Sequence, residues 1–181
     1  MNDNFASSLG FVLRHECAYA PGHEGDLNYV VCEDVPGDTG GLTKFGIDAA
    51  SHPGIDIRGL TFELASAIYH DGEWTECRCD ALPSGVDTVV FDCAVNNGAA
   101  VSAILLQRAV IACGYGIVVD GKIGPQTVRA ATLANGPDLK GRLLQLRRQR
   151  YTDIVLHNPA DAKFLQGWLN RVDDLERFLF A

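Results

Sequence analysis

Glu16 is a carboxylate that the sequence places on the apolar side of a helix. Residues 5–20, FASSLGFVLRHECAYA, carry hydrophobic side chains at helical spacing. On a helical wheel Glu16 lies within about 20° of Phe5, in the direction of the hydrophobic side chains. Burial raises the pKa of a carboxyl group, so that it can stay protonated near neutral pH and donate a proton to a leaving group. The alternative is a structural glutamate that reaches solvent or pairs with Arg14 or Lys44.

A polar, glycine-rich segment, GDTGGLTKFGID, follows at residues 37–48. Gly40 and Gly41 allow the backbone to approach a bulky ligand closely. Asp38 and Thr43 are suited to holding a water molecule or a substrate hydroxyl opposite the helical carboxylate. The same residue types are also typical of an ordinary turn. Other carboxylates close to this segment are alternatives to Asp38: Glu24, Asp26, Glu33 and Asp34.

Helical periodicity dominates the chain after a long loop at residues 21–59, which contains a short β-prone run at 29–32. Further helices are expected at residues 61–72, 86–96, 99–112, 125–134, 138–156 and 160–179. Asn96-Asn97-Gly98 is a helix stop signal, and Pro125 is a start signal. The last helix is expected to bury Phe164, Trp168, Val172, Leu175 and Leu179. The predicted class is mainly α, with a glycine-rich loop and a short β-hairpin after the first helix.

Charge is unevenly distributed along the chain. The net charge is −8, but residues 1–100 carry 16 acidic and 4 basic side chains, whereas residues 101–181 carry 7 acidic and 11 basic ones. The acidic half argues against a nucleic-acid partner, and the basic half is suited to an anionic polymer, although ordinary solvated helices also show such a split. The sequence contains no run of about 18 apolar residues and no signal-peptide pattern at its start, so we expect neither membrane insertion nor Sec-dependent export.

The six cysteines do not form a recognisable metal or catalytic motif. Cys77 and Cys79 form a C-x-C pair, which differs from the C-x-x-C spacing of zinc sites, and the sequence lacks an H-E-x-x-H motif. We therefore expect no metal and no other cofactor. Free thiols are expected in a reducing compartment, whereas an even number of cysteines permits disulfides in an oxidising one. An amidase built on Cys17 would need a histidine such as His52 or His157 close by, which nothing in the sequence predicts.

Several segments, in order, resemble one known family. A helix that carries a glutamate, followed by Tyr19, precedes the pattern D-x-G-G-x-T-x-[FY]-G-I at residues 38–47. This part is similar to the glycoside hydrolase family 108 N-acetylmuramidases of bacteriophage endolysins and bacterial secretion-activator proteins. The later segments FDCAVNNGAA, LLQRAV, VDGKIGPQTVRAA and FLQGWLNRVDDL are similar to the peptidoglycan-binding region that follows the catalytic region in that family. The resemblance covers residues 5–178.

The resemblance implies a lysozyme-like helical bundle and hydrolysis of the β-1,4 bond between N-acetylmuramic acid and N-acetylglucosamine. It implies a catalytic lobe at residues 1–95 and a peptidoglycan-binding-like helical lobe at 96–181, packed together as one compact unit. Glu16 matches the general acid, with Asp38 and Thr43 as further catalytic residues. The predicted substrate-binding residues are Tyr19, Gly40, Gly41, Phe45, Asn96 and Asn97, although the two asparagines are equally suited to ending a helix.

Two departures from the family pattern concern the neighbourhood of Glu16. The family usually has Glu-Gly-Gly-Tyr where this chain has Glu16-Cys17-Ala18-Tyr19, and the segment from Tyr19 to Asp38 is longer than is typical. The second departure leaves the identity of the second carboxylate open. A different class of function, a non-catalytic peptidoglycan-binding or secretion-assisting module with a structural Glu16, is the alternative.

Peptidoglycan is the expected partner, and a monomer is expected. The resemblance implies a protein that is made in the host cytoplasm and reaches the cell wall through a holin, as phage lysis enzymes do. One helix is rich in basic residues and is predicted to assist adsorption to the wall: Lys140, Arg142, Arg147, Arg148 and Arg150. Trp74 and Trp168 are candidates for stacking on sugar rings, with a core position favoured for Trp168.

Overall fold

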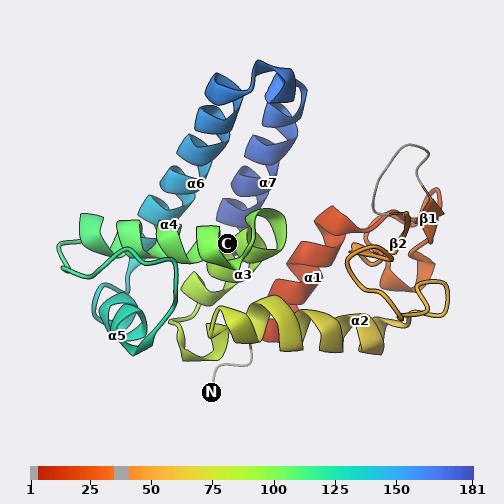
Figure 1. Cartoon of the computed structure of the whole chain (residues 1–181), viewed down its shortest axis with the longest axis horizontal. Helices are drawn as coiled ribbons and strands as arrows, with labels where there is room; N and C mark the ends of the chain where they lie inside the picture. Colours follow the sequence, from red (N-terminus) through yellow and green to blue (C-terminus); the bar gives the residue numbers. More distant parts are fainter. Residues whose placement is uncertain (1–3, 35–40) are drawn as a thin grey trace. The chain divides into compact units, whose positions relative to one another are not determined.

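The computed structural model describes residues 4–34 and 41–181, which are mainly helical (Figure 1). Within these residues the chain forms seven α-helices and a small antiparallel sheet of three strands. The predicted class, mainly α with a glycine-rich loop and short β structure after the first helix, is confirmed. The chain divides into an N-terminal unit, Ala6–Gly72, and a helical unit, Glu73–Ala181 together with Asn4 and Phe5. The expected division into a catalytic lobe at residues 1–95 and a peptidoglycan-binding-like lobe at 96–181 stays a prediction.

Along the chain, the strands of the N-terminal unit follow its first helix and precede its second. Its elements are α1 (Phe5–Glu16), a 3-10 turn (Leu27–Tyr29), β1 (Glu33–Asp34), β2 (Leu42–Lys44), β3 (Ile47–Asp48) and α2 (Phe62–Tyr69). The strand order is β1-β2-β3, and both pairs are antiparallel. Helix α2 begins where the hydroxyl of Thr61 accepts a hydrogen bond from the backbone N–H of Leu64 at 3.3 Å, an N-cap.

The first helix is shorter than its sequence pattern predicts, and it ends at Glu16 rather than at residue 20. Beyond Glu16 the chain becomes extended because its backbone pairs with the β-prone run. The N–H of Ala20 donates to the carbonyl of Tyr29 at 2.9 Å, and the N–H of Val31 donates to the carbonyl of Ala18 at 3.0 Å. Amphipathic spacing cannot reveal such a pairing, which joins residues far apart in the sequence.

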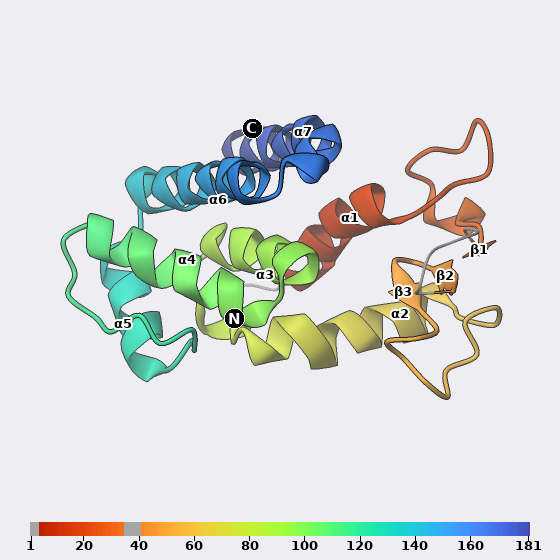
Figure 2. The same ribbon diagram turned by 45° about the horizontal axis from the view of Figure 1, so that its top comes forward.

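The helical unit contains α3 (Val86–Asn97), α4 (Ala99–Ala112), α5 (Pro125–Leu133), α6 (Pro137–His157) and α7 (Ala162–Phe180). Helix α3 is capped by Gly98, whose φ of 85° is a left-handed conformation that favours glycine, and Pro125 occupies the first turn of α5. The predicted stop and start signals are therefore confirmed. Helix α3 packs against α4 and α6, and α6 packs against α7. Figures 1 and 2 both show α6 and α7 side by side.

The core of the helical unit is built around α3, in which every residue from Val86 to Ala94 is buried. Trp74 is fully buried as well, so it is a core residue and not a platform for sugar rings. Helix α7 buries Val172 and Leu175 as expected, but Phe164 is 48% exposed and Trp168 is half-buried. These two rings contact each other, with centroids 5.8 Å apart, and Trp168 stacks on Tyr151 of α6 at 5.2 Å. The predicted apolar face of α7 is thus buried over its second half and partly exposed over its first.

A buried charge cluster joins three helices of this unit. Asp92 of α3 and Arg147 of α6 are completely buried and form an ion pair. Arg171 of α7 donates to the same carboxylate from Nη2 at 2.8 Å and from Nε at 3.0 Å. Burial raises the pKa of Asp92, but the two arginines outweigh burial and hold that pKa below its usual value. The carboxylate therefore stays ionised in the core.

These pairings correct the prediction of a basic helix face at two of its five residues, Arg147 and Arg148, and adsorption through the other three stays a prediction. Arg147 is buried, so it is not available to a wall polymer. Arg148 is paired with Asp173 and Glu176 of α7, each at 2.6 Å, which compensates its charge.

Within residues 4–34 and 41–181, no helix is both long enough and apolar enough to cross a bilayer.

Candidate active site

Glu16 is the last residue of α1 and is half-buried, and the turn between β2 and β3 packs directly against its side chain. The contact is made by Gly46. A Cβ atom added to Gly46 would lie 2.8 Å from Cβ of Glu16 and 2.7 Å from the hydroxyl of Tyr69. Because side-chain atoms do not approach each other so closely, a residue without a Cβ is required at this point. The loop backbone thereby packs against Cβ and Cγ of the candidate catalytic glutamate.

The Phe45-Gly46 turn has a defined left-handed geometry. Its two residues have φ values of 54° and 75°, as in the two-residue hairpin turns that match the twist of the flanking strands. The hydroxyl of Tyr69 donates to the carbonyl of Phe45 at 2.9 Å, and the ammonium of Lys44 donates to the carbonyl of Leu60 at 2.7 Å. Helix α2 and the segment before it therefore hold the turn in place. Phe45, predicted to bind substrate, is 4% exposed and supports the turn from within the fold.

Replacement of Gly46 with alanine is expected to lower both stability and activity. The new methyl group would overlap Glu16 and Tyr69, and the positive φ is unfavourable for alanine, which together reduce the free energy of unfolding by about 2–4 kcal/mol. Chemical denaturation measures this change, and the rate of wall hydrolysis should fall because Glu16 is displaced. Gly54 is a matched control: its φ is also positive, at +95°, but an added Cβ would meet no atom within 4 Å. Equal losses in the two variants would contradict a specific contact at Gly46.

Tyr19 and Cys17 follow Glu16 directly and contribute structure to its surroundings. The hydroxyl of Tyr19 donates to the carbonyl of Leu13 at 3.0 Å, and the backbone of Tyr19 bridges to Val30. Burial raises the pKa of Cys17 to about 11, and the nearby charge of Glu16 adds to the shift. A thiol with such a pKa is protonated at neutral pH and is a poor nucleophile, which argues against an amidase built on Cys17. All six cysteines are free thiols.

Thr43 lies in the central strand of the sheet, between two acidic residues of the neighbouring strands. It lies opposite Glu33 in β1 and opposite Asp48 in β3, and directly paired residues of antiparallel strands share one face. Asp48 accepts a hydrogen bond from the N–H of Ser51 at 2.8 Å, which lowers its pKa. Of the four acidic alternatives to Asp38, Glu33 is the one that lies directly opposite Thr43, and it is exposed. Asp38 and Gly40 themselves lie outside the described residues.

Two of the other acidic alternatives, Glu24 and Asp26, are engaged in local turns, whereas Asp34 lies in β1 opposite Leu42. Asp26 accepts hydrogen bonds from both the backbone and the side chain of Asn28, at 3.0 and 2.8 Å, and caps the 3-10 turn. Glu24 accepts a hydrogen bond from the N–H of Gly22 at 3.2 Å.

The hydroxyl of Thr43 donates a hydrogen bond to the carbonyl of Gly41 at 3.2 Å. This bond fixes the backbone between Gly41 and Thr43.

Asn96 and Asn97 belong to the helical unit, whereas Glu16 and the sheet belong to the N-terminal unit. The hydroxyl of Tyr151 donates to Oδ1 of Asn96 at 2.6 Å, and the Asn97 amide donates to the same hydroxyl at 3.1 Å. Both asparagines therefore anchor the end of α3 to α6, and a role in binding substrate stays a prediction. Gln107 is likewise structural: it is buried and bonds Asp120 at 2.7 Å.

Two residues of the site, Gly46 and Tyr69, did not emerge from the sequence as site residues. Gly46 is part of the F-G element of the glycine-rich pattern, so a signal for it was present. Tyr69 carried no signal, because its role depends on a hydrogen bond to Phe45, 24 residues away. Among residues 4–34 and 41–181, no group of three or more His, Cys, Asp or Glu side chains is arranged to hold a metal ion.

Comparison with known proteins agrees with this architecture. Residues 17–98, beginning directly after Glu16, match Glycosyl hydrolase 108, and residues 101–173 match the Predicted Peptidoglycan domain. No curated protein sequence matches the chain. The structure is similar to that of Brucella abortus SagA, with a TM-score of 0.74 and 25% identity over 99% of this chain and 95% of that one.

These matches confirm the lysozyme-like fold that the resemblance implied. They also support glycoside hydrolase activity, with peptidoglycan as the partner. Residues 17–98 are thus similar to the glycosyl hydrolase 108 family, and the segment that follows, residues 101–173, is similar to the predicted peptidoglycan domain.

Proposed function

We propose that this peptidoglycan hydrolase is an N-acetylmuramidase that cleaves the β-1,4 bond between N-acetylmuramic acid and N-acetylglucosamine, with Glu16 as the general acid. The observation that carries the proposal is the closure of the Phe45-Gly46 turn against Glu16 at the end of α1. This packing limits the positions that the carboxyl group can take, as a proton donor requires. The family match supports the reaction class.

In the proposed reaction Glu16 transfers its proton to the glycosidic oxygen while the bond from that oxygen to the anomeric carbon breaks. The sugar cation that develops is then captured by water, whose proton passes to a second carboxylate. We assign that second role to Asp38, with Thr43 holding the water or a substrate hydroxyl. Glu33 is the alternative, because it lies opposite Thr43 in the sheet.

Asp38→Asn and Glu33→Gln separate these two assignments. Loss of the residue that accepts the proton from water is expected to lower the rate at least about 10²-fold, because water is then a weak nucleophile. We expect this loss for Asp38→Asn and a near-normal rate for Glu33→Gln, measured as reducing ends released from purified sacculi. The opposite result would move the second catalytic role to Glu33.

Product analysis tests the proposed function itself. Digestion of purified sacculi should release new reducing ends without new free amines, because glycosidic bonds and not amides are cleaved. Borohydride reduction before acid hydrolysis identifies the sugar at each new end, and a muramidase yields reduced muramic acid. Reduced glucosamine would indicate the other glycosidic bond, and new free amines would indicate an amidase or peptidase. Each of these outcomes contradicts the proposal.

The biological setting is also a proposal. The family resemblance supports an endolysin-type role in cell lysis by a bacteriophage, in which a monomer made in the host cytoplasm reaches the wall through a holin. Absence of hydrolysis combined with retained binding to sacculi would favour the alternative, a non-catalytic peptidoglycan-binding or secretion-assisting module.

A further inference from the structure

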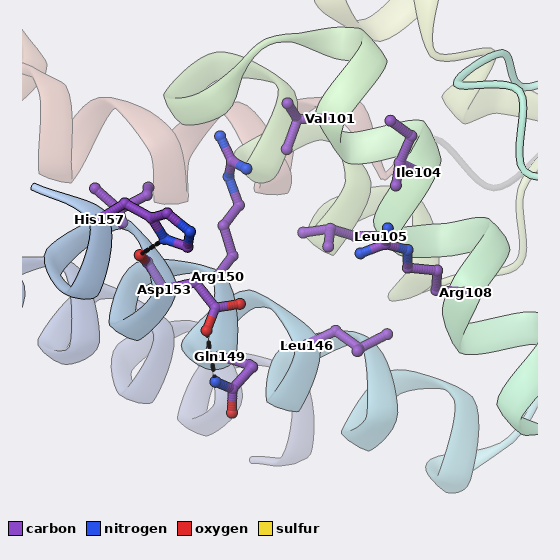
Figure 3. Close-up of a pocket in the computed structure, with 10 residues that line it drawn as sticks. Val101, Ile104, Leu105, Arg108, Leu146, Gln149, Arg150, Asp153 and His157 are labelled. Atoms are coloured by element: carbon purple, nitrogen blue, oxygen red, sulfur yellow. Dashed lines mark hydrogen bonds between the residues drawn. The ribbon is translucent and has the colours of Figure 1, made fainter.

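A groove of about 420 Å³ lies between α4 and α6 in the helical unit (Figure 3). Its walls repeat at helical spacing and are formed by Val101, Ile104, Leu105 and Arg108 of α4 and by Leu146, Gln149, Arg150, Asp153, Ile154 and His157 of α6. All of these residues lie inside the segment that matches the predicted peptidoglycan domain, residues 101–173. No residue of the groove is part of the candidate active site described above.

The groove combines an apolar floor with charges of both signs. Arg150 reaches from α6 toward α4 (Figure 3), and its Nε donates to Oδ1 of Asn97 at 3.0 Å, which orients the guanidinium group. Arg108 is exposed on the facing helix and has no ion-pair partner in the described part of the chain. Asp153 supplies a carboxylate on the same side as Arg150 and accepts a hydrogen bond from Gln149 at 2.9 Å.

We propose that this groove binds the stem peptide of peptidoglycan rather than its sugar chain, an inference that rests on the proposed function. Stem peptides carry several carboxylates, alanine methyl groups and the free amine of a diamino acid. Two arginines are suited to the carboxylates, the aliphatic floor to the methyl groups, and Asp153 to the amine. Sugar rings are usually bound by stacking on Trp, Tyr or Phe, and the walls of this groove contain none of these.

Such a site would direct the enzyme to strands that still carry peptides. It would act on adsorption alone, because the groove belongs to the helical unit and Glu16 to the N-terminal unit. The groove and the catalytic proposal can therefore fail independently. Loss of peptide binding should leave the cleavage of peptide-free glycan strands intact.

Calorimetric titration of the full chain tests the groove, with the tripeptide L-Ala-γ-D-Glu-meso-diaminopimelic acid as ligand. We expect Arg150→Glu and Arg108→Glu each to raise Kd about tenfold, because each replaces a charge-assisted hydrogen bond with repulsion. Arg108→Glu is informative even if Arg150→Glu perturbs the bond to Asn97. Arg129→Glu is the matched control: Arg129 is an exposed residue of α5 in the same unit and does not line the groove. Circular dichroism verifies that each variant is folded.

Two further measurements sharpen the test. The tripeptide with amidated carboxylates should bind at least about tenfold more weakly to the wild type, because the arginines then lack anionic partners. Arg108→Glu should release reducing ends from peptide-free glycan strands at the wild-type rate. Wild-type affinity for the tripeptide in both groove variants, or an equal loss in Arg129→Glu, would overturn the proposal. Failure of the wild type to cleave peptide-free strands would instead count against the muramidase assignment.

Discussion

Replacement of Glu16 with glutamine is expected to abolish nearly all hydrolysis of peptidoglycan while leaving the fold intact. Glutamine keeps the size and hydrogen-bonding capacity of the side chain, so the packing against Gly46 is preserved, but it has no transferable proton. Loss of a general acid typically costs a factor of about 10² to 10⁴ in rate. We expect the upper end of that range, because an unprotonated sugar alkoxide is a poor leaving group. Reducing ends released from purified sacculi measure the rate.

The matched control for Glu16→Gln is Glu63→Gln, which makes the same chemical change at an exposed position in the first turn of α2. That variant should hydrolyse sacculi at the wild-type rate. Glu16→Gln should retain its helical circular dichroism, its melting temperature and its binding to sacculi. Wild-type lysis by Glu16→Gln would refute the role of Glu16 as general acid, and the non-catalytic alternative would be favoured if no hydrolysis is detected in the wild type.

Replacement of Asp92 with asparagine is expected to destabilise the protein strongly. The substitution leaves Arg147 and Arg171 charged and buried without their shared counter-ion. Breaking a buried ion pair in this way costs about 3–5 kcal/mol. For a chain of this size that loss corresponds to a fall of roughly 6–20 °C in melting temperature. Thermal unfolding followed by circular dichroism measures the shift.

Asp173→Asn is the control for Asp92→Asn, because it removes a carboxylate from an arginine pair that is exposed. Exposed pairs contribute at most about 1 kcal/mol, so its melting temperature should change little. Similar melting temperatures for the two variants would contradict a structural role for the buried cluster. A variant in which Asp92, Arg147 and Arg171 are all replaced by aliphatic residues should recover much of the lost stability.

The pH dependence of stability reports on the same cluster. The pKa of Asp92 is lowered in the folded chain, so near pH 4 the folded state binds fewer protons at this site than the unfolded state does. Its contribution is therefore complete above about pH 4, the ordinary pKa of aspartate, and is lost as the pH falls through the folded-state pKa. Asp92→Asn should remove this part of the acid sensitivity. An unchanged acid profile in Asp92→Asn would place the sensitivity at other carboxylates.

Local sequence signals were sufficient for most helices of the helical unit. Gly98 stops α3 through its positive φ, and Pro125 and Pro137 stand in the first turns of α5 and α6. Each of these effects depends on a residue and its immediate neighbours, so the pattern can be recognised without knowledge of the fold. The carboxylate at the end of α1 was recognised for the same reason.

What the sequence could not supply depends on contacts between distant residues. The pairing of Tyr19 with Val30 ends α1 four residues early, and the hydrogen bond from Tyr69 to Phe45 fixes the turn at Glu16. The sequence pattern predicted that Arg147 is part of a basic surface, because helical spacing does not reveal that Asp92 pairs with it in the core. The prediction from charge was therefore wrong for Arg147, which is buried and structural.

The buried cluster of Asp92, Arg147 and Arg171 determines which segment of this protein can be exchanged with a related protein. Asp92 lies in the segment that matches Glycosyl hydrolase 108, while Arg147 and Arg171 lie in the predicted peptidoglycan domain. A chimera joined near residue 100 would inherit the arginines from one parent and depend on the other parent for their counter-ion. Residues 73–181, which hold all three, form the segment that engineering or evolution would have to exchange as a whole.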